Sequence, residues 1–529
     1  QMKSPQMTAQ PDTRTKMPPN GNLTIAIYLA VTGLSAACGL VIEIVAGRMI
    51  APYLGMSLYT WTAVIAVVLA GFSVGHWIGG WLAEKPSGPA RSAVAISLCL
   101  AGLSAALSLV LLRTLSGPVI AIGLPAVPTI LLLTFVLFFP PSLFVGIPSP
   151  VLTKLAIDEA PSRMGTLLGA FYAVGAFGSI VGTLAAGYVF ISYFGSIRTI
   201  LTVALLYLMM AAILFALDRR CKKKPLLARQ TVVPAAIIAL LFGGVILSGR
   251  AVSAFVDNCT KESAYYCIRV IDISGDIGIP ARTMVLDHLG HGTNLRDQPG
   301  ILLTPYVEAQ DALVKAHFQA PQELNAFFIG GGAYTLPRAW LARWPKAKIT
   351  VAEIDPAVTE LARQSFWLNG DPRLTIEHQD ARRALASEPE KSFDVIVGDA
   401  FHDIAVPQHL VTREFFALNA NRLKGDGAYL MNVVDNGSRP RLTLSIQRTL
   451  KSVFPSVELW QPYGQGTRQT FVLIAAKTPT PKKTLYSRVD PESSWQRIPE
   501  DEIAKLQQLT EPLLLTDDFA PVDRLIGVE

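Results

Sequence analysis

Glycines and acidic residues follow successive strand-like runs in the second half of the chain. The triplet Gly330–Gly332 follows the first run, where such a turn lets a ligand approach the backbone at the start of a helix. Glu353 ends the second run about 20 residues later, a spacing at which a carboxylate accepts hydrogen bonds from ribose hydroxyls. Asp380 after the third run can receive an exocyclic amine such as that of adenine. The pattern predicts a site for an adenosine-containing ligand.

Helix capping is the alternative explanation for some of these acids. Asp355 precedes Pro356 and Asp380 precedes Ala381, and both arrangements are typical of helix N-caps. Acids at several successive strand ends nevertheless favour a binding site. The predicted cofactor-binding residues are Gly330, Gly331, Gly332, Glu353, Asp355 and Asp380.

Residues 321–480 have the pattern of a scaffold that brings such strand ends together. Strand-like runs alternate with helical ones, which predicts an α/β doubly wound, Rossmann-like domain. The predicted strands are 326–330, 348–354, 373–379, 393–399 and 427–434, and the predicted helices are 335–344, 356–367, 380–387, 408–423 and 438–453. Two later runs, 456–460 and 470–476, lack a helix between them and predict an antiparallel pair at the sheet edge.

The charge distribution separates this α/β half from a membrane half. Residues 1–249 contain 16 Lys and Arg against 6 Asp and Glu, a net charge of +10, whereas residues 250–529 carry −4. Only 16% of all residues are charged and 51% are hydrophobic, which excludes a disordered chain and an ordinary cytosolic enzyme. A nucleic-acid partner is not expected, because the positive charge of such a protein should lie on its folded soluble part.

Seven apolar runs follow a polar tail (1–22), and each approaches the ~20 residues needed to cross a bilayer. They predict a multi-pass α-helical membrane domain (23–249) of about seven spans. The fourth run contains Pro140, Pro141, Pro148 and Pro150, which must break its helix. The runs are 23–46, 60–83, 92–112, 127–156, 165–192, 197–217 and 231–249.

The Lys and Arg residues of the short loops predict the orientation. Loop 218–229 holds six of them, so it should face the cytoplasm of a bacterial-type inner membrane. One further span then places the following domain on the extracytoplasmic side. Cys259 and Cys267 stand just after that span and predict a disulfide on the oxidising side, with two unrelated buried thiols as the alternative.

Two ionisable residues within the spans, Glu43 and His76, are functional candidates because charged groups in a membrane are costly. The structural alternative is that Glu43 pairs with Arg48 or with His76. Glycines recurring every four residues predict close helix packing. They are Gly71, Gly75 and Gly79, and Gly178 and Gly182.

Several motifs together resemble the spermidine synthase (polyamine aminopropyltransferase) family, in particular its membrane-fused branch. In the soluble half they are ESAYY (262–266) with the following IRV, MVLDHLGHG (284–292), YVE (306–308), the glycine triplet, VAEID (351–355), DPRLTIEHQDAR (371–382), VGDAFHD (397–403) and TDDFAPVDRL (516–525). In the membrane half they are VIEIVAGR (41–48) and residues 55–85. The resemblance covers most of the chain after the tail and implies a class I methyltransferase-type sheet.

The resemblance also implies residue roles. Asp399 would orient and help to deprotonate an attacking amine, and we assign His402 and Asp403 to the same catalytic segment. The chemistry agrees, because an amine attacks a sulfonium carbon only when it is neutral, and a nearby carboxylate can accept its proton. Tyr265 and Tyr306 would line the acceptor side, with interior packing as the alternative. The predicted substrate-binding residues are Tyr265, Tyr306, Glu308, Asp517 and Asp518.

Three positions depart from the family pattern. Ala333 follows the glycines where the family usually has an aspartate that holds the donor's ammonium, His402 replaces a second aspartate, and Val307 replaces a histidine. Fewer carboxylates favour S-adenosylmethionine over its decarboxylated form as the donor, and methyl over aminopropyl as the transferred group. We therefore predict a membrane-embedded alkyltransferase with methyl preferred. The alternatives are a polyamine aminopropyltransferase and a non-catalytic nucleoside-binding transport or sensing protein.

The remaining predictions concern organisation and partners. A small β-rich segment (250–320) should precede the Rossmann-like domain, and a C-terminal extension (481–529) should pack on it. No metal is expected, because CxxC pairs and HExxH spacing are absent from the sequence. The expected partners are the lipid bilayer and a small-molecule or membrane-associated acceptor, and the resemblance adds a homodimer.

Overall fold

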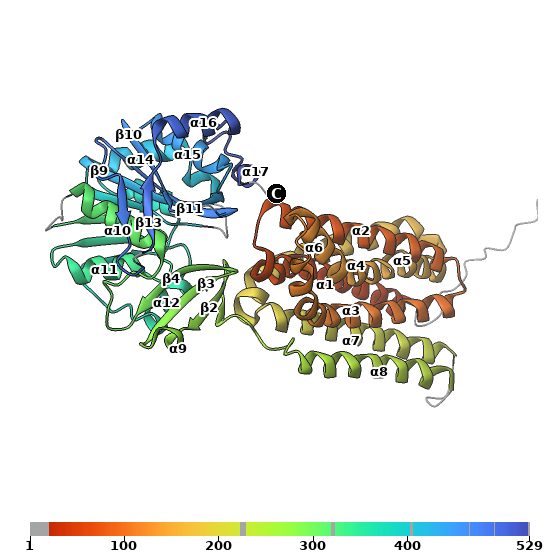
Figure 1. Cartoon of the computed structure of the whole chain (residues 1–529). Coiled ribbons are helices and arrows are strands. Elements are labelled where there is room, and N and C mark those ends of the chain that lie inside the picture. Colours follow the sequence, from red (N-terminus) through yellow and green to blue (C-terminus); the bar gives the residue numbers. More distant parts are fainter. Residues whose placement is uncertain are drawn as a thin grey trace, which may run out of the picture.

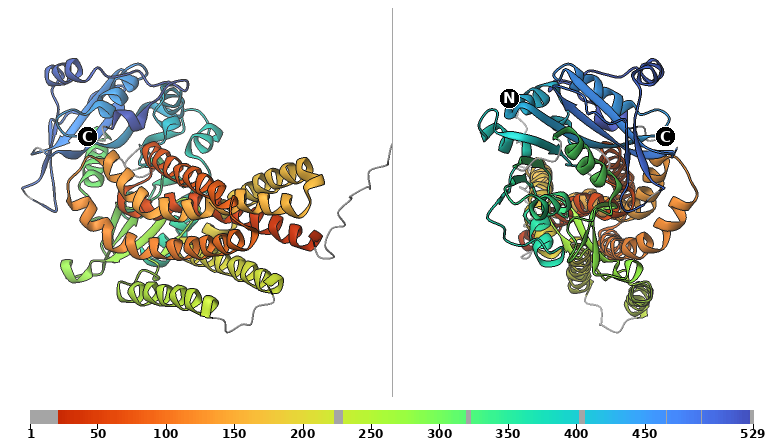
Figure 2. Two further views of the ribbon diagram at one scale, coloured as in Figure 1. Left: turned by 90° about the vertical axis from the view of Figure 1, so that its right-hand side faces the viewer. Right: turned by 60° about the vertical axis from the view of Figure 1, so that its left-hand side comes forward.

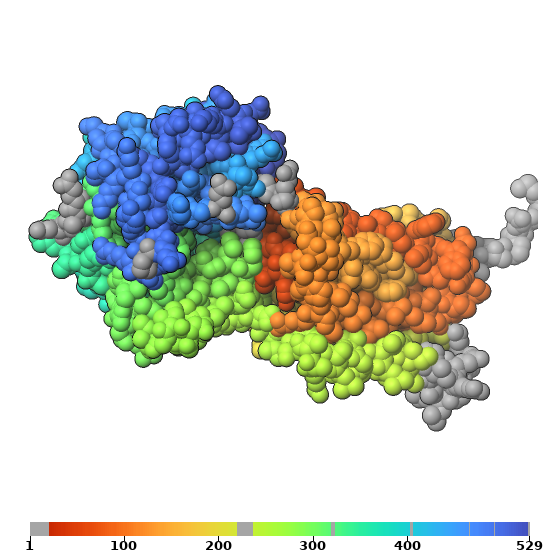
Figure 3. All heavy atoms as spheres, in the orientation of Figure 1, coloured from red at the N-terminus to blue at the C-terminus, as the bar shows by residue number. Residues whose placement is uncertain are grey.

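A helical bundle and an α/β domain lie end to end in the computed structural model (Figure 1). The space-filling view shows them as two lobes in contact (Figure 3). The structure describes residues 21–222, 229–318, 323–401, 406–464, 466–490 and 492–526. The predicted tail (1–22) therefore lies almost entirely outside the described residues.

Eight α-helices form the described part of the bundle. They are α1 Gly21–Leu54, α2 Leu58–Ala83, α3 Ser87–Ala121, α4 Ala126–Gly146, α5 Pro148–Glu159, α6 Met164–Ala185, α7 Ser196–Lys222 and α8 Arg229–Ala251, with the π-helical η2 Ala186–Phe194 continuing α6. The predicted break in the fourth run falls at Ile147, between α4 and α5, whereas Pro140 and Pro141 lie inside α4.

Six helical segments, not seven, are long and apolar enough to cross a membrane among the described residues. α4 and α5 together form one of them, over 126–159. The seventh predicted run lies in α8, whose described apolar part, Ala236–Ala251, is too short to qualify. α8 packs against α3 on the outer side of the bundle (Figure 2). A seventh span is thus not confirmed.

The glycine rows bring helix backbones into close contact, as predicted. A Cβ at Gly75 would lie 2.1 Å from Leu143 O, and a Cβ at Gly178 would lie 2.1 Å from Gly33 O. Side chains larger than glycine would therefore force α2 from α4 and α6 from α1. Glu43 forms no ion pair with Arg48 or His76 within the described part of the chain, so the suggested pairing is wrong.

A four-stranded antiparallel sheet follows the bundle, within the segment predicted to be β-rich. Its order is β1-β2-β3-β4. The strands are β1 Lys261–Glu262, β2 Cys267–Asp272, β3 Ala281–Leu286 and β4 Leu289–Leu295, with α9 Ser274–Ile277 after β2. Cys259 and Cys267 form a disulfide that ties the start of this sheet to the segment leaving α8.

The main sheet has nine strands in the order β12-β13-β10-β11-β9-β8-β5-β6-β7. Strands β5 to β9 are parallel, and the pairs that involve β10 to β13 are antiparallel. The strands are β5 Asn325–Ile329, β6 Lys348–Ala352, β7 Leu374–Glu377, β8 Phe393–Gly398, β9 Leu423–Asn436, β10 Ser456–Pro462, β11 Arg468–Ala476, β12 Thr484–Tyr486 and β13 Ser494–Arg497. The pair β10 and β11 is not at the edge as predicted, because β12 and β13 of the C-terminal region extend the sheet beyond it.

Helices cover both faces of this sheet, as expected for a doubly wound fold. Phe328 of β5 packs against Trp340 of α11, whereas its neighbour Phe327 belongs to the hydrophobic core on the opposite face, which also contains Phe415 of α14. The helices are α10 Pro305–Phe318, α11 Thr335–Arg343, α12 Pro356–Ser365, α13 Ala381–Ser387, η3 Gln408–Leu410, α14 Arg413–Arg422, α15 Arg441–Lys451, α16 Glu500–Thr510 and α17 Val522–Leu525.

The strand order reverses between β5 and β8. The chain runs from β5 through β6 to β7 on one side and then returns to β8 on the other. Ligands of open α/β sheets bind at such a switch point, outside the carboxyl ends of the strands. Gly330 and Asp399 follow these two strands and therefore meet there.

Candidate functional site

The glycine turn after β5 is fixed by close backbone contacts. Gly330 has φ of +95°, and a Cβ there would lie 2.6 Å from Asp399 O. Gly332 has φ of +50°, and a Cβ there would lie 2.7 Å from His291 O. Both positions need glycine for conformation and for space.

Glu353 is buried directly beneath this turn. Its Oε2 accepts from the Gly331 N–H at 2.8 Å, and its Oε1 accepts from the Asp355 N–H at 2.9 Å. Burial raises the pKa of Glu353 to about 7, although these N–H donors oppose the shift. A carboxylate held in this way is rigid, and a ligand hydroxyl at the turn would find an oriented acceptor.

Asp399 ends β8 beside the same turn, and the Tyr306 hydroxyl of α10 donates to its Oδ2 at 3.2 Å. Its Oδ1 is buried and accepts no well-formed hydrogen bond among the described residues, and the Asn432 side chain lies close enough to lower the pKa of Asp399. Burial raises the pKa of Asp399 to about 7. The pKa of Tyr306 lies well above its usual value because of burial and the adjacent Asp399, so Tyr306 stays a hydrogen-bond donor. Asp399 can thus exchange a proton near neutral pH.

Asp355 and Asp380 act as helix caps in the structure, which was the alternative explanation for both. Asp355 accepts from the Ala357 N–H at 2.9 Å and from the Ser263 hydroxyl. Asp380 accepts from the Arg383 N–H at 3.1 Å, and His409 Nε2 lies 2.7 Å from its other oxygen. Asp380 remains partly exposed, whereas the buried Asp355 has both oxygens occupied.

The ESAYY segment reaches the site through a tyrosine that the sequence reasoning did not select. Tyr266 is buried, and its hydroxyl donates to Phe401 O at 3.1 Å, two residues after Asp399. The neighbouring Tyr265 is half-buried and packs against Tyr266, with ring centroids 6.3 Å apart. The position of Tyr266 within the motif was the available signal.

Thr335 is a second residue that the sequence reasoning missed. It begins α11 and lines the cavity beside Asp399, and its buried hydroxyl has no partner in the described part of the chain. The cavity has a volume of only about 20 Å³. Sites for small molecules commonly exceed ~300 Å³, so a nucleoside would bind only after the lining residues move.

The remaining predicted substrate residues are not brought to Asp399. Glu308 accepts from the Ser487 hydroxyl and the Arg488 N–H, at 2.6 and 2.7 Å. Asp517 pairs with Arg382 at 2.6 Å, which lowers the pKa of Asp517 to about 2. Asp518 is exposed next to it. His402 and Asp403 lie outside the described residues.

The bundle contacts the ESAYY segment directly. Arg48 of α1 donates from Nη2 to Ser263 O at 2.9 Å and from Nη1 to Tyr265 O. Glu262 accepts from the Ser196 N–H at 2.8 Å and from the Ser196 hydroxyl at the start of α7. The Arg48 and Glu262 side chains are 9% and 7% exposed, so this is a buried polar junction.

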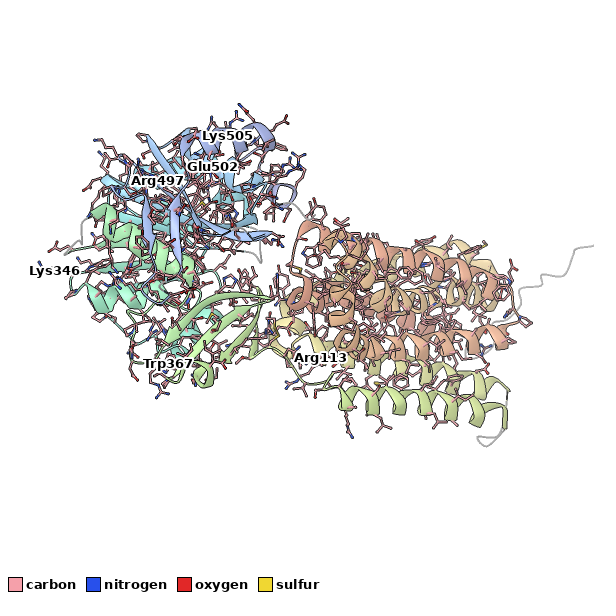
Figure 4. The ribbon with its side chains drawn as sticks, in the orientation of Figure 1. Arg113, Lys346, Trp367, Arg497, Glu502 and Lys505 are labelled. Carbon is pink, nitrogen blue, oxygen red and sulfur yellow. A yellow bond between two sulfur atoms is a disulfide. The ribbon has the colours of Figure 1, made fainter. Side chains whose placement is uncertain are left out.

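A second arginine lies at the same junction but contacts the connecting segment. Arg113 of α3, labelled in Figure 4, donates to Val256 O at 3.0 Å and to Ser253 O at 3.4 Å. Nearby, Asp257, Cys259 and Glu262 have ligand-type atoms within 4.8 Å of one another. Cys259 is in the disulfide, so this group does not offer a thiolate to a metal.

The comparisons with known proteins match the α/β part of the chain. A sequence profile of the spermine/spermidine synthase domain matches residues 315–465. The C-terminal part of this chain carries a spermine/spermidine synthase domain. It includes the glycine turn, Glu353 and Asp399, and the helical part before it is consistent with a fused membrane-type domain.

Curated relatives bear related names. A probable polyamine aminopropyl transferase of Bifidobacterium longum is 29% identical over 236 residues, which are 41% of this chain and 52% of that protein. The match thus spans about half of that relative. Polyamine aminopropyltransferase 2 of Streptomyces coelicolor is 24% identical over 485 residues, 87% of this chain and 82% of the relative. That alignment is too long for the α/β part alone, so it extends into the helical part.

A solved structure of a probable spermidine synthase from Corynebacterium glutamicum is also similar. It is 22% identical, covers 49% of this chain and 95% of its own length, and has a TM-score of 0.43.

Proposed function

We propose that this chain is a membrane-associated polyamine aminopropyltransferase, which transfers the aminopropyl group of decarboxylated S-adenosylmethionine to an amine. The observation that carries the proposal is the half-buried, hydrogen-bonded pair of Asp399 and Tyr306 beside the glycine turn and Glu353. The names of the relatives support aminopropyl transfer better than the methyl transfer that the sequence departures favoured.

The proposed reaction joins the amine nitrogen to the propyl carbon attached to sulfur. The carbon–sulfur bond breaks, its electron pair stays on sulfur, and the sulfonium becomes a neutral thioether. The proton of the attacking nitrogen passes to Asp399, whose pKa of about 7 suits proton acceptance at neutral pH. Asp399 also orients the amine, because Tyr306 fixes one of its oxygens and leaves the other open.

We propose that the donor binds at the glycine turn. Glu353 would accept hydrogen bonds from its ribose, and the partly exposed Asp380 would contact its adenine. Ala333 offers no carboxylate to the donor's ammonium, and the unpartnered Thr335 hydroxyl next to it is a candidate replacement. His402, Asp403, Asp517 and Asp518 remain proposed contacts of the acceptor or its segment, together with Tyr265. A homodimer stays a proposal from the family resemblance.

We also propose that α8 crosses a bilayer together with the six apolar helical segments, which places the α/β domain on the extracytoplasmic side. The described basic connections, between α2 and α3 and between α5 and α6, lie at the end of the bundle away from the α/β domain, and the disulfide suits an oxidising compartment. Arg48 and Arg113, which this orientation places on the less basic side, bind backbone carbonyls of the junction.

The test is transfer and binding by the full-length protein with both donors. We expect tighter calorimetric binding of decarboxylated S-adenosylmethionine than of S-adenosylmethionine, and aminopropyl transfer to putrescine or spermidine. Asp399→Asn should lower kcat by about 10²–10⁴-fold while donor binding persists, because it removes the proton acceptor but keeps the shape.

Asp501→Asn on the exposed face of α16 is the matched control and should behave as the wild type. Preferred binding of S-adenosylmethionine with methyl transfer would restore the methyl prediction. Full activity of Asp399→Asn would contradict the assigned role of Asp399.

A further inference from the structure

A cavity of about 580 Å³ lies inside the helical bundle, between α1, α2, α5, α6 and the end of α4. This volume is in the range of small-molecule sites, whereas the cavity beside Asp399 is about 20 Å³. Much of the cavity is formed at the break between α4 and α5. Pro148 and Pro150 lack N–H groups, so the carbonyls one turn earlier lose helical donors and the backbone there is open to a ligand.

The polar groups that line this cavity include hydrogen-bond donors and no carboxylate, which suits an anionic group, and Lys154 among them is ion-paired with Asp158. Lys154 of α5 and His76 of α2 line it, and no Asp or Glu does so in the part of the chain that the structure describes. Lys154 Nζ donates to Asp158 at 2.5 Å and keeps two further N–H donors. His76 Nδ1 is 2.6 Å from Phe72 O, which leaves Nε2 for a ligand. A polyamine cation would find no carboxylate here.

Two hydroxyls at the cavity are unsatisfied. Thr32 and Ser35 of α1 line it and are each 3% exposed, and neither hydroxyl has a hydrogen-bond partner within the described residues. A buried hydroxyl without a partner is costly, particularly in a membrane. A ligand that carries hydrogen-bond acceptors would satisfy both.

The wall formed by α6 connects the cavity to the apolar outside of the bundle. Leu168 and Tyr172 line the cavity and are also 41% and 75% exposed on the helix surface. A ligand can therefore enter sideways, from the hydrocarbon. α5, which carries Lys154, lies toward the end of the bundle away from the α/β domain (Figure 1).

We propose that this cavity binds an anionic phospholipid from the surrounding bilayer. Lys154 and His76 hold its phosphate, and the Thr32 and Ser35 hydroxyls donate to its ester oxygens. The acyl chains lie along Phe171 and leave the cavity past Leu168 and Tyr172. The proposal is independent of the transfer reaction, because none of these residues belongs to the site at Asp399.

The experiment is native mass spectrometry of the full-length protein in mild detergent, with added dioleoylphosphatidylglycerol, dioleoylphosphatidylcholine or inorganic phosphate. We expect a retained phosphatidylglycerol molecule in the wild type and much less phosphatidylcholine. Gly175→Leu should reduce retention by at least about tenfold, because Gly175 lines the cavity and a Cβ there meets no atom within 4 Å, so the side chain fills the space.

Gly169→Leu is the matched control. It lies on the same helix, a Cβ there also meets nothing within 4 Å, and it does not line the cavity, so lipid retention should equal that of the wild type. Lys154→Gln keeps the volume and should abolish the preference for phosphatidylglycerol, even if Gly175→Leu fails to fold. Equal lipid retention by Gly175→Leu and Gly169→Leu would overturn the proposal. Retention of inorganic phosphate without any lipid would overturn it as well.

Discussion

Two carboxylates with pKa values of about 7 face the glycine turn, the buried Glu353 and the half-buried Asp399, and they differ in what surrounds them. Glu353 has both oxygens engaged by backbone N–H groups. Asp399 has one oxygen on Tyr306 and one that accepts no well-formed hydrogen bond among the described residues. Burial is the main cause of both shifts, but only Asp399 has an oxygen available to take a proton from a substrate.

A pH profile separates these two groups. A base must be deprotonated to act and the amine must be neutral, so kcat/KM should fall about a hundredfold per pH unit below the Asp399 pKa of about 7. Above pH 7 a shallower rise should continue as the acceptor amine, with a pKa of about 10, loses its proton. Asp399→Asn should abolish the step near pH 7 and keep the amine-dependent rise. Initial rates between pH 5.5 and 9.5 measure both.

Glu353→Gln is the control for this profile. It removes the other group that titrates near pH 7, and it should weaken donor binding while the step near pH 7 persists. A step that disappears with Glu353→Gln and persists in Asp399→Asn would reverse the two assigned roles.

At the residue scale, the sequence predicted which residues follow the strands, because the end of a hydrophobic run marks the end of a strand. It could not distinguish a ligand contact from a cap. Asp355 and Asp380 satisfy helix N-termini, and only the folded chain shows that Asp380 remains accessible. Thr335 was missed because its importance depends on an unsatisfied hydroxyl, which no sequence pattern reveals.

At the scale of elements, α1 of the bundle is linked to the ESAYY segment through Arg48. Its guanidinium binds the carbonyls of Ser263 and Tyr265, and the Tyr266 hydroxyl of the same segment binds Phe401 O beside Asp399. A chain of contacts thus runs from a helix of the bundle to the proposed acceptor side of the site. Arg48 is a positioning residue in this arrangement.

Arg48→Gln should loosen the segment and raise the KM for the acceptor by about tenfold, with a smaller change in kcat, because two charge-assisted hydrogen bonds to the backbone are lost. The Kd of the donor should stay unchanged. Arg113→Gln is the matched control, since Arg113 binds carbonyls of the connecting segment and should leave the acceptor KM as it was. Equal effects of both variants would indicate a general loss of stability instead of positioning.

The elements themselves were predictable where a pattern repeats over many residues. The parallel strands, their helices and the glycine rows of the bundle all follow from periodicity. The predictions failed at ends and edges. β12 and β13 are short, and they extend the sheet beyond β10 through pairing with a strand distant in sequence. The apolar stretch of α8 is too short to show whether this helix crosses a membrane.

At the scale of the whole molecule, the decisive question is which side of the bilayer the α/β domain occupies. A donor of the proposed kind is a charged nucleoside derivative, so an extracytoplasmic site needs a supply across the membrane. The disulfide and the positive loops favour that side, and the sidedness follows from neither the fold nor the site. Two exposed lysines at opposite ends of the molecule allow a direct measurement.

Lys505 lies on α16 of the α/β domain (Figure 4), and Lys85 follows α2 at the far end of the bundle. We expect a membrane-impermeant maleimide to label Lys505→Cys in intact cells, and to label Lys85→Cys only after the membrane is permeabilised. Cys38 and Cys99 are buried and Cys259 is paired with Cys267, so a Cys221→Ser protein, which lacks the fifth cysteine, supplies the background. The reverse labelling would place the domain in the cytoplasm, where a charged donor is directly available. In that case the basic loops would face outward, against the positive-inside rule, and Cys259 and Cys267 would lie in a reducing compartment.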